Sequence, residues 1–168
     1  MFRRVEIPEI EPESFIPVYL GLPSGRKWAI RNVGASNHTD CGLMMDFDTA
    51  NSIELKDGWH APSPEDFLEL VENCESEWTL EEGVPGRIFK SKINGNSIFL
   101  PAAGYTWFDK DDESDSGTTL LYRGTDGNYW SSGFYSASYA YYLYFSSSGV
   151  YPQDYDDRRN GFTVRAVQ

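Results

Sequence analysis

The most regular hydrophobic pattern in the chain lies in the segment SPEDFLELVENC, residues 63–74. Ser63 can accept a hydrogen bond at a helix N-terminus, Pro64 suits the first helical position, and Asp66 lies where the helix dipole favours an acid. The apolar residues that follow recur at the spacing of one helical face: Phe67, Leu70, Val71 and Cys74. The pattern predicts a helix that packs on the core through this face.

Shorter apolar runs bounded by turn residues predict strands. Apolar residues stand near alternate positions between Trp28 and Val33, which indicates a half-buried strand. In residues 86–107, two apolar runs flank the turn-forming pair Asn94-Gly95 and predict a β-hairpin. Residues 37–52 show no clear period and are expected to form a loop.

The segment YAYYLYF, residues 139–145, has the composition of a strand whose two faces differ. Because side chains alternate along a strand, one face would carry Tyr141, Leu143 and Phe145. The other face would carry Ala140, Tyr142 and Tyr144. The first set suits a core face, so the second set is predicted to point outward.

The first residues of the chain read as an extended arm, residues 1–19, ahead of one domain, residues 20–168. Pro8, Pro12 and Pro17 stand among alternating acids and aliphatic residues, a pattern that suits an arm or an edge strand and prevents a helix. Such an arm is a candidate contact for an oligomer. With 168 residues, 40% of them hydrophobic, the chain is long enough to bury one good core.

Charge and hydropathy exclude two classes of partner. The formal net charge of −12 would repel phosphate backbones and anionic lipids, so no nucleic acid is expected, while a neutral or cationic ligand remains. No apolar run approaches the roughly 18 residues of a spanning helix, so no direct membrane insertion is expected. The first residues carry acids and prolines where a signal peptide would be apolar.

The residues that could carry chemistry form no convincing active site. Cys41 and Cys74 can be paired or free, since the sequence does not show whether the fold brings them together. His38 stands near Cys41 without an identifiable oxyanion motif, so no catalytic residue is predicted. The acidic residues 109–115 alternate as calcium ligands can, but the glycine of an EF-hand is replaced by Ser114, so we expect a solvated loop. No metal and no cofactor is predicted.

Tyrosine is concentrated in one part of the chain. Eight of the eleven tyrosines lie between Tyr129 and Tyr155, among serines and aspartates, and residues 131–168 lack lysine, glutamate, methionine and tryptophan. An aromatic core strand would explain the tyrosines, but each buried phenol would then need a hydrogen-bond partner. Tyrosine mixed with serine and glycine is typical of antibody paratopes, so we favour a binding surface.

Five segments resemble, in order and spacing, the Fibrobacter succinogenes major paralogous domain, a branch of the C-type-lectin-like fold. They are LPSGRKWAIRNVGA, GWHAPSPEDFLELVENC, NGNSIFLPAAGY, GNYWSSG and NGFTVRAV. The resemblance covers about residues 20–168. It implies an α+β fold of the C-type-lectin-like type, with small mixed or antiparallel sheets, one or two helices and long loops.

Some members of this family are variable proteins of diversity-generating retroelements, found in Bacteroides and gut phages. There, asparagine codons in a C-terminal segment, here about residues 129–165, scatter to Tyr, Asp, Ser, Phe and Gly but not to Lys, Glu, Gln, Met or Trp. By this resemblance Gln153 is fixed or differently encoded, and the variable, ligand-binding positions are Phe134, Tyr135, Ser138, Tyr139, Tyr142, Tyr144, Ser146, Tyr151, Asp154, Tyr155, Asp156 and Asp157. The scaffold positions are Trp130, Ser131, Ser132, Leu143, Phe145, Gly161, Phe162, Val164 and Arg165.

The resemblance implies a non-enzymatic binding module, an adhesin or a phage receptor binder, at a cell surface or on a virion. Its partner would be a protein or glycan receptor on another cell. One alternative is a structural or assembly domain of a surface or virion complex. A second is an enzyme of unknown reaction on a fold like that of formylglycine-generating enzymes, but these enzymes use a C-terminal cysteine pair and this chain has no cysteine after Cys74.

Overall fold

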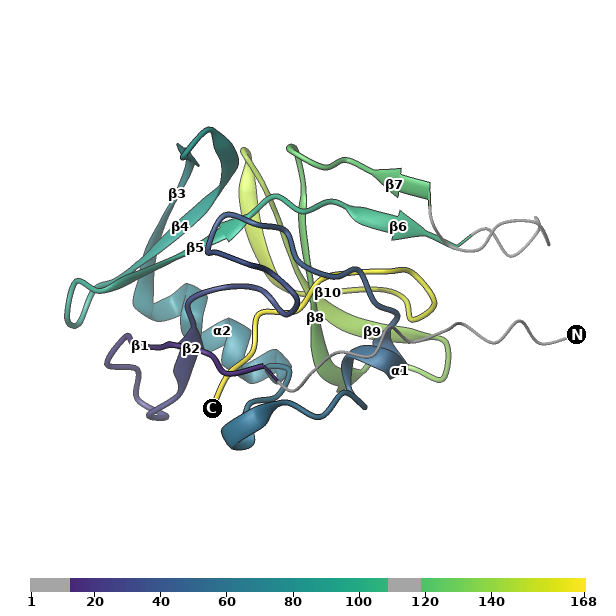
Figure 1. Cartoon of the computed structure of the whole chain (residues 1–168), viewed down its shortest axis with the longest axis horizontal. Coiled ribbons are helices and arrows are strands. Elements are labelled where there is room, and N and C mark those ends of the chain that lie inside the picture. Colours follow the sequence, from purple (N-terminus) through teal and green to yellow (C-terminus); the bar gives the residue numbers. More distant parts are fainter. Residues whose placement is uncertain (1–12, 109–118) are drawn as a thin grey trace, which may run out of the picture.

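A computed structural model describes residues 13–108 and 119–168, and within them the chain is an α+β protein in which strands predominate (Figure 1). The helices are α1 (Phe47–Ala50), the 3-10 turn η1 (Lys56–Gly58) and α2 (Pro64–Asn73). The strands are β1 (Pro17–Tyr19), β2 (Lys27–Ala29), β3 (Cys74–Glu81), β4 (Val84–Ser91), β5 (Ser97–Pro101), β6 (Tyr105–Trp107), β7 (Thr119–Leu121), β8 (Gly127–Phe134), β9 (Tyr139–Ser146) and β10 (Gly149–Asp157). They pair as small antiparallel sheets: β1-β2, β3-β4-β5, β6-β7 and β8-β9-β10. No helix in the described ranges is both long and apolar enough to cross a membrane.

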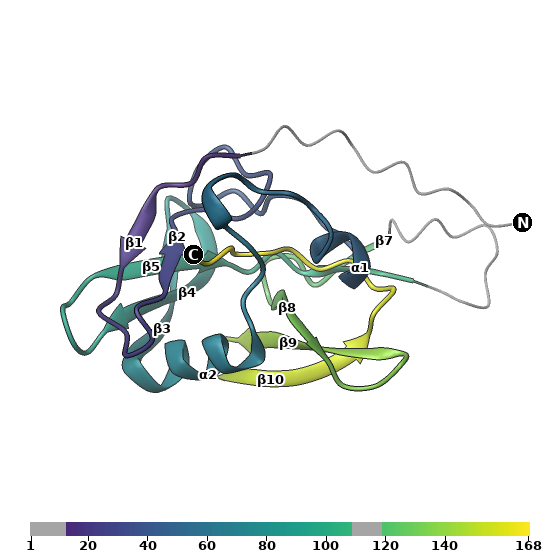
Figure 2. The same cartoon turned by 90° about the horizontal axis from the view of Figure 1, so that it is seen from below.

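Helix α2 is confirmed with the predicted cap. The backbone N–H of Asp66 donates to Ser63 Oγ at 3.0 Å, and the backbone N–H of Ser63 donates to Asp66 Oδ2 at 2.9 Å, so the two residues form a capping box. Phe67 and Leu70 are buried, and α2 lies alongside β9 and β10 (Figure 2). The helix therefore covers part of one face of the β8-β9-β10 sheet.

The predicted hairpin is confirmed as β4 and β5, but the sheet contains a third strand that the pattern did not predict. β3 begins at Cys74, directly after α2, and pairs along its whole length with β4. Its sequence is polar and largely exposed, so no hydrophobic alternation marks it. Cys74 is a buried free thiol, and Cys41 is a half-buried free thiol.

Two other expectations need correction. The strand expected between Trp28 and Val33 ends at Ala29, and Ile30 is exposed. The expected loop at residues 37–52 contains the one-turn helix α1, whose N-cap Asp46 accepts a hydrogen bond from the Thr49 backbone at 2.7 Å. A single capped turn is too short to create a helical period in the sequence.

Part of the predicted arm belongs to the folded domain. Phe15 is buried with its ring 5.5 Å from Trp59, and β1 pairs with β2. The folded part of the described chain therefore begins before the predicted boundary at residue 20. Residues 1–12 of the arm lie outside the described residues.

The segment 161–167 passes through the middle of the molecule and completes its core (yellow in Figure 1). It forms isolated bridges to residues far away in the chain, including Met45 with Phe162 and Trp28 with Val167. The buried apolar residues form two clusters, and this closing segment contributes Phe162 to one and Val167 to the other. Both clusters therefore depend on residues that follow the tyrosine-rich segment.

Candidate ligand-binding surface

The register of β9 and β10 divides the tyrosine-rich segment between the two faces of the sheet. Tyr141 lies opposite Tyr155, whereas Tyr142 lies opposite Asp154 and Tyr144 opposite Tyr151. Because neighbouring residues of a strand point to opposite faces, the first pair occupies one face and the other two pairs occupy the reverse face. The predicted variable positions thus form two surfaces.

On the first face, four tyrosines make a cluster that we call the tyrosine stack: Tyr135, Tyr139, Tyr141 and Tyr155. The rings of Tyr135 and Tyr155 are parallel within 3°, with centroids 3.9 Å apart. Tyr141 meets the Tyr135 ring edge-on at 5.6 Å, and Tyr139 meets the Tyr155 ring at 6.2 Å. Tyr135, Tyr139 and Tyr155 are exposed, so the stack offers flat aromatic area to solvent.

The start of α2 borders the tyrosine stack and holds the sheet beside it. A Cβ on Gly133 would come within 2.5 Å of Pro64, so this close approach requires glycine. Gln153 is exposed, and its Nε2 donates to the backbone oxygen of Pro64 at 3.3 Å. The contact gives a structural role to a residue that the sequence predicts to be fixed.

The reverse face corrects the prediction that Ala140 and Tyr142 point into solvent. Ala140 is fully buried and Tyr142 is only 7% exposed. The Tyr142 ring lies 4.6 Å from Phe162 and 6.1 Å from Trp130. The prediction was wrong because the closing segment covers this face, and strand alternation alone does not reveal a second covering layer.

Tyr142 is the buried middle of a longer line of aromatic rings, which we call the aromatic row: Tyr122, Tyr105, Phe162, Tyr142, Tyr144 and Tyr151. Successive ring centroids along this row are 6.0, 5.8, 4.6, 6.5 and 5.8 Å apart. Tyr122 and Tyr151, at its two ends, are exposed. The row therefore joins the β6-β7 ribbon to the β9-β10 hairpin.

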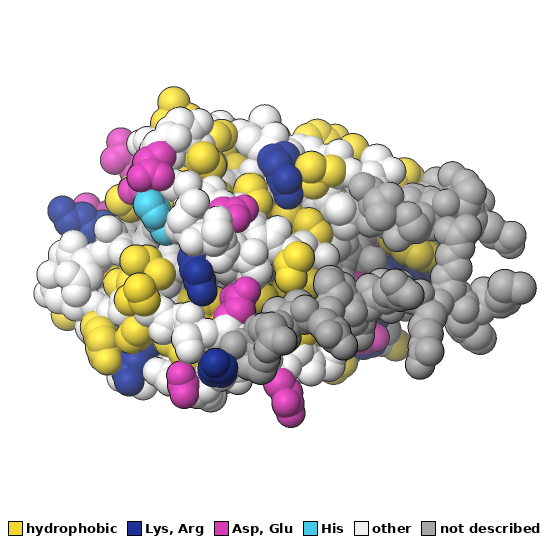
Figure 3. All heavy atoms as spheres, viewed as in Figure 1, with side chains coloured by type: hydrophobic (Ala, Val, Ile, Leu, Met, Phe, Trp, Pro, Cys, Tyr) yellow, Lys and Arg dark blue, Asp and Glu magenta, His cyan; other side chains and the backbone are white. Residues whose placement is uncertain are grey.

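Sequence reasoning missed Tyr105 and Tyr122. They lie outside the tyrosine-rich segment and show no distinguishing spacing, so their membership becomes visible only when β6 and β7 are placed beside the closing segment. In Figure 3, hydrophobic side chains, a class that includes tyrosine, gather on the surface over β6 and β7. This ribbon extends the candidate surface beyond the predicted variable positions.

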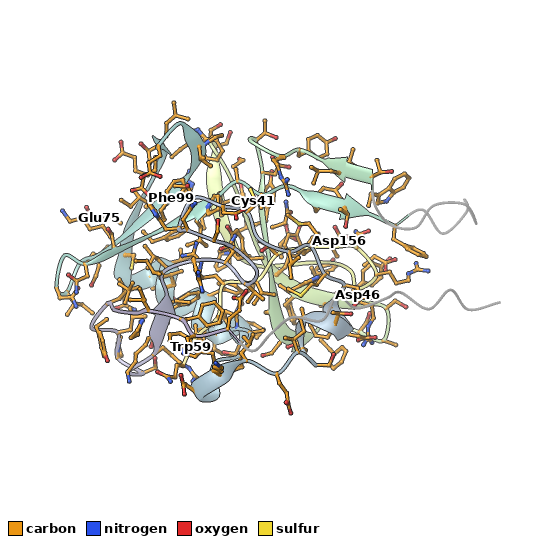
Figure 4. All side chains as sticks on the ribbon, in the orientation of Figure 1. Cys41, Asp46, Trp59, Glu75, Phe99 and Asp156 are labelled. Atoms are coloured by element: carbon orange, nitrogen blue, oxygen red, sulfur yellow. The ribbon has the colours of Figure 1, made fainter. Side chains whose placement is uncertain are left out.

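Three carboxylates accompany the aromatic row. Burial raises the pKa of Asp156, labelled in Figure 4, and it also raises the pKa of Asp126. Burial likewise raises the pKa of Tyr142, and the carboxylates of Asp154 and Asp156 add to this effect. The Tyr142 phenol and the carboxylates of Asp154 and Asp156 are thus close enough for electrostatic interaction.

The remaining predicted variable positions are dispersed. The Phe134 ring lies 4.9 Å from Phe47 and under the Arg158 guanidinium at 4.7 Å. Ser138 lines an open pocket of about 340 Å³ together with Ala137, Asp46, Asp48, Arg158 and Arg159. Asp157 pairs with Arg159 at 2.6 Å, and Ser146 Oγ accepts from the Ser148 backbone at 3.1 Å. Phe134 and Ser138 therefore lie at the turn between β8 and β9, next to Tyr135 and Tyr139 in the chain, and they border α1 and Arg158.

The predicted scaffold positions are almost all buried. The Trp130 indole donates to the Met45 backbone oxygen at 2.8 Å, and the Ser131 hydroxyl donates to the Tyr141 backbone oxygen at 2.6 Å. Ser132 is exposed, although its backbone N–H donates to Pro62 at 2.8 Å. The buried positions are Trp130, Ser131, Leu143, Phe145, Gly161, Phe162, Val164 and Arg165.

The histidine considered for catalysis lies beside an acid. His38 lies 3.1 Å from a carboxylate oxygen of Glu81. Among residues 13–108 and 119–168, no group of three or more His, Cys, Asp or Glu side chains could hold a metal ion. The acidic residues 109–115, considered for calcium, lie outside the described residues.

Comparison with known proteins gives a match to the C-terminal part of the chain. A family model described as a domain of unknown function, DUF8237, matches residues 88–167. The matched segment runs from within β4 to the end of the closing segment, so it contains both the tyrosine stack and the aromatic row. No curated protein and no solved structure matches the chain.

Proposed function

We propose that this chain is a non-enzymatic binding module of the C-type-lectin-like type whose tyrosine-rich C-terminal segment contacts a protein or glycan receptor on another cell. The segment would be the diversified region of a retroelement variable protein, displayed as an adhesin or a phage receptor binder. The small antiparallel sheets, the single long helix and the long connecting segments are consistent with the proposed fold.

One observation carries the proposal. Five aromatic side chains at predicted variable positions are between 43% and 58% exposed: Phe134, Tyr135, Tyr139, Tyr151 and Tyr155. The predicted scaffold residues around them are buried, apart from Ser132. A rigid frame that exposes several large rings can exchange those side chains with little effect on folding, while aromatic anchors supply much of the energy of protein interfaces.

The first test compares two fourfold alanine variants on arrays of purified cell-surface proteins and of glycans. One variant replaces Tyr135, Tyr139, Tyr151 and Tyr155. The control replaces four side chains elsewhere that are 55% to 68% exposed: Ile16, Tyr19, Leu80 and Ile93. We expect the first variant to stay folded, because the replaced side chains are exposed. If each anchor contributes about 2 kcal/mol to binding, this variant loses array binding that the control retains.

The outcome also separates the alternatives. Equal loss of binding in both variants, or an unfolded first variant, contradicts the proposed surface. A stable oligomer in light scattering that the tyrosine variant dissociates would instead favour the assembly domain.

A second, independent test concerns the gene. The proposal expects a near-copy of the coding segment for residues 129–165 beside a reverse transcriptase gene, with the two copies differing at adenines. Sequencing the locus checks this expectation. A locus without such a copy removes the retroelement from the proposal and leaves the binding surface to the array experiment.

A further inference from the structure

The aromatic row combines residues from two parts of the chain. Tyr105 and Tyr122 come from the β6-β7 ribbon and the turn that follows it, whereas Tyr144 and Tyr151 come from β9 and β10. Phe162 of the closing segment lies between them and contacts both Tyr105 and Tyr142. A ligand that touches both exposed ends of the row would therefore contact Tyr151 inside the predicted variable segment and Tyr122 outside it.

Tyr122 adopts a backbone conformation that disfavours its own side chain. Its φ is 56°, in the left-handed region where glycine or asparagine is preferred. Its backbone oxygen accepts hydrogen bonds from the N–H groups of Thr125 and Asp126, at 3.1 and 3.0 Å, so the turn fixes this conformation. A large exposed aromatic residue at a strained position is more easily explained by contact with a ligand than by folding.

The carboxylates beside the row lack a cationic partner in the described part of the chain. None of the ion pairs found there includes Asp126, Asp154 or Asp156. The nearby arginines are held by other groups. Arg159 pairs with Asp157, and Arg123 Nε donates to the Ala103 backbone oxygen at 3.0 Å.

We propose that the aromatic row and its acids, Asp154 and Asp156, bind an arginine or lysine side chain of a protein ligand. This inference rests on the proposed function and specifies the chemistry of its partner. Phenol rings attract a cation through their electron-rich faces, and two carboxylates that form no ion pair within the described residues add a direct charge attraction. The net charge of −12 favours the same class of partner over an anionic one.

Tyr19, at the end of β1, provides a matched control. It is 56% exposed, close to the 59% of Tyr122, and it lies outside the predicted variable segment and both aromatic clusters. Removing its ring changes the exposed aromatic area of the protein without changing the proposed cation site. Tyr122 and Tyr19 can therefore be compared directly.

The experiment titrates the whole chain with the peptide acetyl-Gly-Arg-Gly-amide and follows tyrosine ring signals by NMR. The control peptide contains citrulline, which has the shape of arginine without its charge. We expect the citrulline peptide to bind at least about fivefold more weakly. Tyr122→Ala and the double variant Asp154→Asn, Asp156→Asn should weaken arginine binding to a similar extent, whereas Tyr122→Phe and Tyr19→Ala should not.

Equal binding of both peptides, or equal effects of Tyr122→Ala and Tyr19→Ala, would show that the row is not a cation site. The array experiment keeps this failure apart from failure of the proposed function. If array binding still depends on the exposed tyrosines, the chain remains a binding module with a different ligand. A glycan captured through the row would likewise overturn the cationic partner while supporting the module.

Discussion

Single tyrosines in this chain serve two physical roles that composition does not distinguish. Tyr129 is fully buried, and its hydroxyl donates to the Pro101 backbone oxygen at 2.7 Å and accepts from Asn32 at 3.1 Å. Tyr135 and Tyr155 have the same side chain, but they stack on each other at the surface. The roles differ because Tyr129 has polar partners inside the core, whereas the other two keep their phenols in water.

Asp156 permits a prediction at the residue scale. Burial raises its pKa above the ordinary value of 3.8, so between these two pKa values the folded state binds more protons than the unfolded state. The ionised carboxylate therefore lowers the unfolding free energy at pH 7, and this cost disappears below the unfolded pKa. We expect Asp156→Asn to raise the unfolding free energy at pH 7, by less than about 1 kcal/mol because the group is partly solvated.

Urea denaturation at pH 7 and pH 3 measures this effect. Glu77→Gln, at an exposed position on β3, removes one negative charge without removing a buried one and serves as the control. An advantage of Asp156→Asn over the control should be present at pH 7 and absent at pH 3. The same advantage at both pH values would show that ionisation of Asp156 is not its cause.

Among the elements, the ones predicted correctly are those whose signals are local. Helix α2 was predictable because its cap and its apolar stripe lie within twelve residues, and the β4-β5 hairpin because Asn94-Gly95 dictates the turn. β3 was not predictable, because it is held by pairing with β4 rather than by a hydrophobic face of its own. The burial of Tyr142 depends on the closing segment, about twenty residues further along the chain.

The β8-β9 pairing permits a prediction at the element scale. Gly127 lies opposite Phe145, and a Cβ on Gly127 would come within 2.1 Å of the Phe145 ring. Gly149, at the start of β10, has room, because its nearest neighbour would be 3.5 Å away. Gly127→Ala should lower the unfolding free energy by about 1–3 kcal/mol, whereas Gly149→Ala should change it by less than about 0.5 kcal/mol.

Chemical denaturation of both variants tests the pairing. The same small effect at the two positions would mean that Phe145 does not pack against Gly127 as described. The comparison concerns the frame of the candidate surface, since Phe145 is fully buried and lies next to Tyr144 in β9.

For the whole molecule, Arg165 of the closing segment connects distant parts of the chain. Its guanidinium is fully buried and donates to Asn32 Oδ1 at 2.8 Å and to the backbone oxygens of Ala29 at 3.2 Å and Phe99 at 2.7 Å. Burial lowers its pKa to about 10, which leaves it charged at neutral pH. Because the guanidinium group is planar and carries several N–H donors, it reaches all three acceptors at once.

Arg165→Lys should therefore cost about 3 kcal/mol of unfolding free energy, because an ammonium group leaves buried carbonyl oxygens without donors. Arg31→Lys is the matched control, since the Arg31 guanidinium donates to the exposed Ser14 backbone oxygen at 3.2 Å. Its cost should stay below about 1 kcal/mol. Thermal unfolding followed by tryptophan fluorescence reports both costs, and similar values would remove the special role of Arg165.

The closing segment has a consequence for damaged copies of this gene. A premature stop codon or a frameshift anywhere in the tyrosine-rich stretch also removes residues 161–167, including Phe162 and Val167, which complete the two core clusters. Without these residues neither core cluster is complete, so we expect such a product not to fold. The order of segments along the chain thus makes folding depend on translation through to residue 167.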